Sequence, residues 1–285
     1  MIKLSRRGLI LNTFVFDLDG TLINGKMEIS EKTVEQIYRI YEKKENIILC
    51  SGRMYKSVIF VRDKFLPFLK DYAPVVSYNG SVIADKKGEI VFSSVIDKNT
   101  SLELLEYFTE RNIHKQIYLN DFLYSDNEND NIKLYAKHAG VDFEIIPSLS
   151  DFMEKSNNLP IKIIAIGESE LLCDVQKELV PKYSELNIVK SFTTYLDINN
   201  KNSSKGLAVK KLSEMMNFDY KKAYIFGDSE NDVSMLEISD NSFAMGNADE
   251  YVKSKAAYTT KTNYEDGVAF AIEKIYSDTD LSDII

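Results

Sequence analysis

Residues 14–21 read Phe-Val-Phe-Asp-Leu-Asp-Gly-Thr, and this stretch decides the fold. Residues 13–16 are too few and too apolar for a surface helix, so they predict a strand that is buried on both faces. Gly20 then ends the strand, because glycine permits a tight turn. Asp17 and Asp19 are therefore expected at the carboxyl end of a parallel strand, where open α/β sheets bind their ligands.

The two carboxylates of this stretch are close in sequence and repel each other unless a cation or a proton intervenes. A hard cation such as Mg²⁺ is the natural partner, because it takes oxygen ligands. An isolated Asp-x-Asp pattern is also compatible with an ordinary strand that ends in a polar turn. The pattern alone therefore leaves a catalytic and a structural interpretation open.

Further apolar runs alternate with amphipathic helices on both sides of a different middle region. Strands are predicted over residues 47–50, 74–77, 223–226, 242–245 and 257–260. Helices are predicted over residues 34–41, 55–69 and 206–216 and from residues 248 and 266 onward. Ser30 is expected to cap the first helix. This alternation predicts an α/β fold with a Rossmann-like parallel-sheet core and right-handed crossovers.

The middle region has a mixed pattern. Residues 86–88, Lys-Lys-Gly, predict a hairpin turn between two short strands. The elements predicted beyond it are helices near residues 100–112, 129–139 and 169–183 and strands near 116–119, 143–146 and 161–166. Residues 199–204 predict a polar connector. We therefore expect a catalytic core of residues 1–83 and 195–285, interrupted by an inserted α+β cap of residues 84–194.

The composition limits the classes of function. The 285 residues are 44% hydrophobic and 28% charged, which is ordinary for a globular protein. A net charge of -9 argues against general nucleic-acid binding, because phosphate backbones need a basic surface. A metal and one lysine still suffice to hold a small anionic substrate. Cys50 and Cys173 lie in apolar stretches and are expected to be buried free thiols, which suits a reducing cytoplasm.

The start of the chain resembles a signal peptide only in part. Lys3, Arg6 and Arg7 precede the apolar residues 9–11, as in a signal peptide, but the acidic pair interrupts the apolar region. No small-residue cleavage pattern follows. No apolar run approaches the roughly 18 residues that a membrane helix needs. The sequence therefore predicts a cytoplasmic protein without a membrane partner.

Four chemical features follow one another at the ends of predicted strands or the starts of helices. They are the pair Asp17 and Asp19, then Ser51, then Lys205, then residues 227–232, Gly-Asp-Ser-Glu-Asn-Asp. Together they resemble the haloacid dehalogenase (HAD) superfamily, in particular its Cof-type sugar phosphatases, which carry a large inserted cap. The resemblance covers nearly the whole chain. It implies a Mg²⁺-dependent phosphatase of small phosphate monoesters, with sugar phosphates ahead of nucleotides, flavin mononucleotide and pyridoxal phosphate.

The resemblance also implies roles for individual residues. Asp17 is expected to be the nucleophile that forms an aspartyl-phosphate, and Asp19 to protonate the leaving oxygen and then act as a base. Mg²⁺ is expected to bind the carboxylates of Asp17 and Asp228 and the backbone carbonyl of Asp19. Phosphate binding is expected from Leu18, Ser51, Gly52, Lys205 and Asn231.

Other residues of the motifs are expected to support these groups. The positive end of the helix after Ser51 is expected to help hold the phosphate. Asp232 is expected to orient Lys205 or a metal-bound water. Arg53 either steers anions or braces its loop, and residues 79–80, Asn-Gly, are expected to be architectural.

Two other functions stay open. A phosphomutase of the same fold would return the phosphate to a bound sugar, which the sequence does not separate from hydrolysis. A non-catalytic sugar-phosphate sensor is disfavoured, because the acidic pair is intact. The sequence lacks the residues for hydrolysis by zinc or by a catalytic triad, since the only histidines, His114 and His138, lie in the predicted cap.

The cap aromatics Tyr118, Phe122 and Tyr124 are expected mainly to pack the core of the cap. The expected partner is a small phosphate ester, and the expected state is a monomer or a weak homodimer.

Overall fold

The computed structural model describes residues 11–277, apart from the side chains of residues 138, 139, 191 and 192. Lys3, Arg6 and Arg7 of the signal-like stretch lie outside the described residues. Between residues 11 and 277, no helix has the length and apolar character that a membrane crossing requires.

Two compact units make up the chain. Among the described residues, the first unit contains 11–49 and 209–277, and the second contains 50–208. The predicted core and cap boundaries at residues 84 and 194 stay a prediction.

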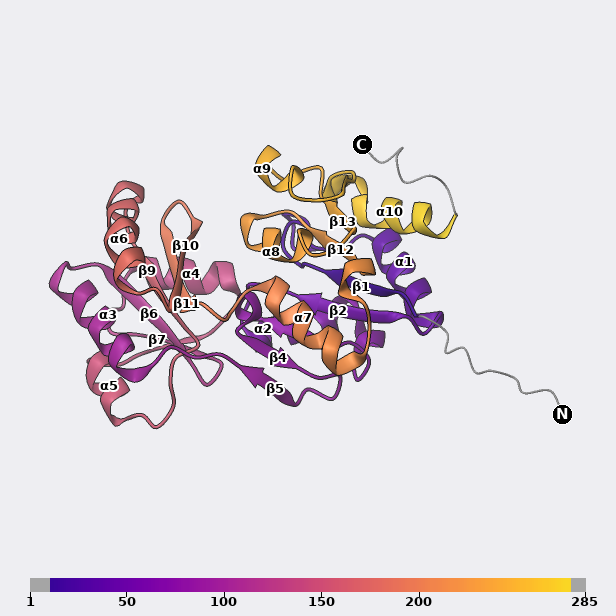
Figure 1. The fold of residues 1–285 in the computed structure, drawn as a ribbon. Helices are drawn as coiled ribbons and strands as arrows, with labels where there is room; N and C mark the ends of the chain where they lie inside the picture. The colour runs from indigo at the N-terminus through magenta and orange to yellow at the C-terminus, as the bar shows by residue number, and fades with distance from the viewer. Residues whose placement is uncertain (1–10, 278–285) are drawn as a thin grey trace. The chain divides into compact units, whose positions relative to one another are not determined.

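A parallel sheet forms the centre of the first unit (Figure 1). Its strand order is β14-β13-β12-β1-β2, with β1 at Thr13–Phe16, β2 at Asn46–Cys50, β12 at Tyr224–Gly227, β13 at Asn241–Ala244 and β14 at Tyr258–Thr259. Every neighbouring pair in this series runs parallel, which confirms the α/β fold with a Rossmann-like core. The rings of Phe16, Phe226 and Phe243 stack across three strands at centroid distances of 5.2 and 4.8 Å.

Helices flank this sheet. They are α1 at Glu31–Glu42, most of α7 at Lys205–Met216, α8 at Val233–Leu236, α9 at Glu250–Lys253 and α10 at Gly267–Tyr276. Ser30 caps α1 as predicted, since its Oγ accepts a hydrogen bond from the Thr33 amide at 3.2 Å. Helix α1 buries Ile37 and Ile40 and packs against α10.

The second unit begins with one helix and a small antiparallel meander. These are α2 at Tyr55–Phe65, β3 at Val75–Ser77, β4 at Val82–Ala84 and β5 at Ile90–Ser93. The antiparallel pairing of β4 with β5 confirms the predicted hairpin. Helix α2 is shorter than predicted, because Leu66 precedes Pro67 and a residue before proline is driven out of the helical region.

A six-stranded sheet in the order β10-β11-β9-β6-β7-β8 makes up the rest of this unit. Its strands are β6 at His114–Leu119, β7 at Phe122–Ser125, β8 at Phe143–Ile145, β9 at Lys162–Ile166, β10 at Leu186–Phe192 and β11 at Tyr195–Asn200. Its helices are α3 at Lys98–Glu110, α4 at Asp130–Ala139, α5 at Leu149–Lys155 and α6 at Ser169–Lys182. Figure 1 shows α3 next to α5, with which it packs.

The two faces of the six-stranded sheet differ in chemistry. One face carries Ile117, Ile163 and Leu196, which form a core with apolar residues of α3, α5 and α6. The other face packs Ile164 against α4 but also carries the buried ions Lys162 and Asp197. Side chains two apart on a strand, or paired across strands, share a face, which places these residues together.

Several features of this sheet differ from the sequence analysis. Strands β7, β10 and β11 and helix α5 were not predicted. The polar connector, predicted over residues 199–204, is shorter in the structure. Asn199 and Asn200 are the last two residues of β11, and Asn199 is 2% exposed. Cys50 is buried as expected, whereas Cys173 is half-buried beside Lys190, whose Nζ lies 3.4 Å from its Sγ.

Candidate active site

The turn after β1 separates the first two acidic residues by their exposure. Asp17 is 3% exposed and its amide donates to the Phe226 carbonyl of β12 at 3.0 Å, while Asp19 is exposed. The turn closes through the Ile23 amide, which donates to the Leu18 carbonyl at 2.7 Å. One carboxylate is therefore held inside the site and the next is open to solvent.

Gly20 allows this turn to approach the second acidic cluster. Its φ of 82° lies in the left-handed region, and a Cβ on it would lie 2.1 Å from Asp228 Oδ2. Thr21 also contacts this carboxylate, because its Oγ1 lies 3.4 Å from Asp228 Oδ1. Only glycine fits here, since any side chain would displace Asp228.

The loop after β12 is organised by Asp232. This side chain is fully buried, and its Oδ2 accepts from the amides of Asp228 and Ser229 at 2.9 and 3.0 Å. The carboxylate thereby fixes the turn that presents Asp228, whereas Asn231 is exposed. Such capping by an acidic residue is a common way to stabilise a turn of this kind.

Three carboxylates of the first unit meet at one point. Asp17, Asp228 and Asp232 each offer one oxygen, and these oxygens lie within 4.8 Å of one another. Unit charges 4 Å apart repel by about 4 kcal/mol at an effective dielectric constant of about 20. A divalent cation with oxygen ligands removes this repulsion, and the all-carboxylate donor set fits Mg²⁺. The residues present therefore suit the expected metal, and the exposed side chain of Asp19 is not among these three.

Adding Mg²⁺ is expected to raise the temperature of thermal unfolding of the wild-type chain. A ligand at about 100 times its Kd stabilises the folded state by about 2.7 kcal/mol, which is a rise of roughly 5 °C for a chain of this size. The measurement is a thermal melt followed by circular dichroism, with and without the metal.

The control for this shift is a pair of variants. Asp228→Asn is expected to lose most of the rise. Asp219→Asn is expected to keep it, because the Asp219 side chain is not one of the three carboxylates and accepts a hydrogen bond from the Lys221 amide in a separate turn. An equal rise in both variants would place the metal away from the three carboxylates.

The other predicted site residues belong to the second unit. Ser51 is fully buried at the end of β2, and its Oγ accepts from the Arg53 amide at 3.2 Å. Gly52 lies between them in this loop. Arg53 Nη1 lies 3.3 Å from Ser57 Oγ in α2, which favours the bracing role for this arginine. Lys205 is the first residue of α7 and is 1% exposed.

The amino-terminal end of α2 is already occupied. The amides of Tyr55 and Lys56 donate to the two carboxylate oxygens of Asp121 at 3.0 and 2.9 Å. These two amides are therefore engaged by a protein carboxylate. The contribution to phosphate binding that was expected from this end of the helix does not come from them. Sequence reasoning missed Asp121.

Asn247 is a further residue that sequence reasoning missed. Its Nδ2 donates to the Gly20 carbonyl at 2.9 Å and lies 3.3 Å from Asp228 Oδ2. It follows β13 by three residues, so it lies near the carboxyl end of a strand paired with β12. The signal that identified the acidic pair, a polar residue just after an apolar strand, also applies to Asn247.

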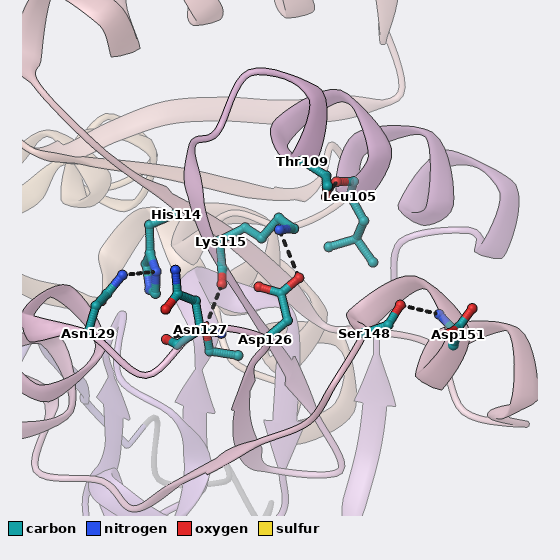
Figure 2. A network of polar contacts seen from close by, with 10 residues as sticks. Leu105, Thr109, His114, Lys115, Asp126, Asn127, Asn129, Ser148 and Asp151 are labelled. Atoms are coloured by element: carbon teal, nitrogen blue, oxygen red, sulfur yellow. Dashed lines mark hydrogen bonds and ion pairs between the residues drawn. The ribbon is translucent and has the colours of Figure 1, made fainter.

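A separate polar network lies in the second unit around β6 (Figure 2). The ring of His114 lies between the amides of Asn129 and Gln116, each 3.0 Å away, and Lys115 pairs with Asp126 at 2.8 Å. Burial lowers the pKa of His114 to about 4, so its imidazole is neutral at ordinary pH.

This network borders a cavity of about 600 Å³ that His114 and Lys115 help to line. Because side-chain amides engage the ring nitrogens of His114, in place of the carboxylate and the nucleophilic hydroxyl of a triad, this histidine does not support triad chemistry in the cavity. The side chain of His138 lies outside the described residues.

The predicted packing roles of the aromatic residues agree with their contacts. Tyr118 is 3% exposed and packs edge-on against Tyr78 at a centroid distance of 5.3 Å. Tyr124 packs against Phe152 at 4.9 Å, and Phe122 lies 5.2 Å from Tyr124. These rings are engaged with the protein's own core.

The chain is similar to known proteins over almost its full length. Residues 14–272 match the sequence model of the haloacid dehalogenase-like hydrolases. The chain is 28% identical to 5-amino-6-(5-phospho-D-ribitylamino)uracil phosphatase YwtE of Bacillus subtilis, over 94% of this chain and 99% of that protein. It is 36% identical to the solved structure of TM0651 from Thermotoga maritima, with a TM-score of 0.84 over 95% of this chain and 99% of that one. A haloacid dehalogenase-like hydrolase from Bacteroides thetaiotaomicron is 28% identical, with a TM-score of 0.84 over 93% and 99%.

Proposed function

We propose a specific reaction for this chain. The chain belongs to the haloacid dehalogenase-like hydrolases and is a phosphatase of that family. It hydrolyses small phosphate monoesters with Mg²⁺ through an aspartyl-phosphate on Asp17. The observation that carries this proposal is the meeting of Asp17, Asp228 and Asp232 within 4.8 Å. A buried carboxylate beside two others is a poor arrangement for stability alone, and it suits a site that binds a cation and an anion in turn.

The first half-reaction transfers the phosphoryl group to the protein. A carboxylate oxygen of Asp17 attacks phosphorus, the bond from phosphorus to the ester oxygen breaks, and that oxygen takes a proton from Asp19. The exposed position of Asp19 suits this role, because its carboxylate can exchange a proton with solvent. In the second half-reaction Asp19 accepts a proton from water as the water oxygen attacks the aspartyl-phosphate, which restores Asp17 and releases phosphate.

Charge neutralisation is the other requirement of phosphoryl transfer. Mg²⁺, held by Asp17, Asp228 and the backbone carbonyl of Asp19, would offset the negative charge of the phosphate and of the nucleophile. Leu18, Ser51, Gly52, Lys205 and Asn231 are proposed to hold the phosphate oxygens. The positive charge of Lys205, at the first residue of α7, supports this role, because phosphoryl transfer needs cations close to the phosphate oxygens.

We propose a polyol or sugar as the leaving group. Support comes from the polar face of the six-stranded sheet, where Lys162 Nζ lies 2.5 Å from Asp197 Oδ2. Among the described residues, Asp197 Oδ1 is buried and accepts no hydrogen bond. Because an unpaired buried acceptor is costly, a donor from a substrate is a suitable partner.

Two tyrosine hydroxyls beside the same face, from Tyr118 of β6 and Tyr135 of α4, add a donor. The Tyr118 hydroxyl donates to the Tyr135 hydroxyl at 3.2 Å, and burial raises the pKa of both groups, so they stay protonated. A substrate hydroxyl both donates and accepts, and so matches a carboxylate oxygen and a tyrosine hydroxyl together. The phosphorylated ribityl chain in the name of the Bacillus subtilis relative agrees with this substrate class.

The experiment that tests the proposal is phosphate release from a panel of phosphate monoesters, with and without Mg²⁺. The panel contains sugar and polyol phosphates, nucleotides, flavin mononucleotide and pyridoxal phosphate. Metal-dependent release, highest with the sugar or polyol phosphates and abolished in Asp17→Asn, is the expected result. Release that needs no metal, or a preference for nucleotides, would contradict the corresponding part of the proposal.

The same panel separates the two alternative functions. A phosphomutase would convert one sugar phosphate to its isomer with little release of phosphate, and a sensor would bind ligand without turnover. A cytoplasmic location and a monomeric or weakly dimeric state stay predictions.

A further inference from the structure

A carboxylate on the turn between β6 and β7 collects three hydrogen-bond donors. Asn120 and Asp121 form this turn with φ values of 52° and 56°. Asp121 Oδ1 accepts from the Tyr55 amide at 3.0 Å and from the Tyr78 hydroxyl at 2.6 Å, and Oδ2 accepts from the Lys56 amide at 2.9 Å. All three donors lie outside the six-stranded sheet that carries Asp121.

Helix α2 depends on this carboxylate for its cap. Met54 holds the N-cap position and offers no side-chain hydrogen bond to the helix. Asp121, which is 66 residues from Tyr55, provides the missing acceptor and a negative charge at the positive end of the helix. The first turn of α2 directly follows the loop of Ser51, Gly52 and Arg53.

Tyr78 braces the same loop from the other side. It is 1% exposed, its amide donates to the Arg53 carbonyl at 2.8 Å, and the Asn79 amide donates to the Ser51 carbonyl at 3.1 Å. Tyr78 and Asn79 both have positive φ, at 52° and 55°. A backbone of this kind persists only where surrounding contacts hold it, and the Asp121 hydrogen bond is one of them.

The turn that contains Tyr78 also touches the start of α7. A Cβ on Gly80 would lie 2.2 Å from the Ser204 carbonyl oxygen and 3.1 Å from the Lys205 amide nitrogen. Residues 78–80 therefore contact both segments of this unit to which phosphate binding is assigned, the loop of residues 51–53 and the start of α7. A change in the position of Tyr78 would displace both segments.

We propose that Asp121 is a positioning residue that holds the Ser51–Gly52–Arg53 loop in its phosphate-binding conformation through α2 and Tyr78. This inference rests on the proposed function, which assigns phosphate binding to that loop. Three donors face the carboxylate, so the position needs a group that only accepts, and an amide would direct its own N–H toward one of them. Burial and the neighbouring carboxylate raise the pKa of the Tyr78 hydroxyl, so it stays a donor over the working range of pH.

The test compares phosphate affinity in Asp121→Asn with that in the wild type. The probe is inorganic phosphate, measured as a Ki in the presence of Mg²⁺ and as a Kd by calorimetry. We expect both constants, and the KM of the best substrate in the panel, to rise roughly tenfold, while kcat changes less than about threefold and the Mg²⁺ concentration for half-maximal activity is unchanged. Asp219→Asn, which removes a carboxylate from another backbone cap, is expected to leave all of these at wild-type values.

Tyr78→Phe supplies the second variant. It removes one of the three donors with little change in shape, and it is expected to raise the Ki of phosphate by a smaller factor. The double variant Asp121→Ala/Tyr78→Phe is expected to match Asp121→Ala alone, because each of the two single changes removes the hydrogen bond between Tyr78 and Asp121. Full additivity would show that Asp121 does not act through Tyr78 and would overturn that part of the inference.

The outcomes separate the inference from the proposed function. A wild-type chain that binds phosphate but releases none from any ester contradicts the proposed function, and the effect on Kd still tests Asp121. An active wild type with an unchanged phosphate Ki and Kd in Asp121→Asn overturns the inference alone. A fall in thermal stability without a change in these constants also overturns it, because Asp121 would then have a structural role only.

Discussion

Asp17→Asn is expected to lower phosphate release by about 10⁴-fold or more while the chain stays folded. The amide of asparagine has no anionic oxygen for attack on phosphorus, so the covalent step is lost. The structure predicts that folding survives the change, because Asp17 is one of three carboxylates within 4.8 Å and a neutral side chain relieves their repulsion. The measurement pairs phosphate release with thermal unfolding in metal-free buffer, where the variant is expected to be at least as stable as the wild type.

Asp240→Asn is the matched control for this variant. Asp240 is exposed and its described contact is a backbone hydrogen bond to Lys221, so the same chemical change is expected to leave activity and stability unaltered. Residual release in Asp17→Asn above about a hundredth of the wild-type rate would show that another group is the nucleophile. A large loss of stability would show that the carboxylate is needed for folding, contrary to the repulsion argument.

The strands and helices of the first unit were predictable because their signals are local. The run at residues 13–16 is apolar on both faces, as a central parallel strand requires, and β1 has those bounds in the structure. Ser30 signalled the start of α1 through its own side chain. Such signals need only a few neighbouring residues, so a single sequence contains them.

The elements of the six-stranded sheet were harder to predict because distant partners stabilise them. Asn199 begins a polar stretch of sequence that is typical of a connector. In the structure, however, its Nδ2 donates to Ser81 Oγ and to the Ile161 carbonyl, each at 3.3 Å. Ser81 is 118 residues away in the sequence, so no local pattern indicates that this asparagine is buried in a strand. Strands β10 and β11 were therefore not predicted, and the end of β11 was included in the polar connector of residues 199–204.

The same reason explains which site residues were missed. Asp17 and Asp228 follow apolar strands directly and are visible in the sequence, whereas Asn247 reaches the Gly20 carbonyl across 227 positions. Asp121 lies on a hairpin turn, where an acidic residue usually only stabilises the turn itself. Its partners at Tyr55 and Tyr78 become apparent only when the chain is folded.

Asp19→Asn is expected to slow turnover by about 10²- to 10⁴-fold, the range of a lost general acid–base catalyst. The size of the effect depends on the leaving group, and this dependence identifies the role. A sugar alkoxide needs the proton of Asp19 to leave, whereas p-nitrophenolate leaves without one. With p-nitrophenyl phosphate, the first step therefore survives in the variant, while attack of water on the aspartyl-phosphate still lacks its base.

Asp19→Asn is consequently expected to release a burst of about one p-nitrophenol per chain and then stall. Intact-mass measurement during the stall is expected to show one added phosphoryl group. The double variant Asp17→Asn/Asp19→Asn is the control, and it is expected to give neither the burst nor the added mass, because the acceptor oxygen is gone. A burst that persists in the double variant would place the phosphoryl group on another residue. Wild-type turnover of sugar phosphates by Asp19→Asn would remove Asp19 from the chemistry, and its exposed carboxylate would then be only part of the turn that follows β1.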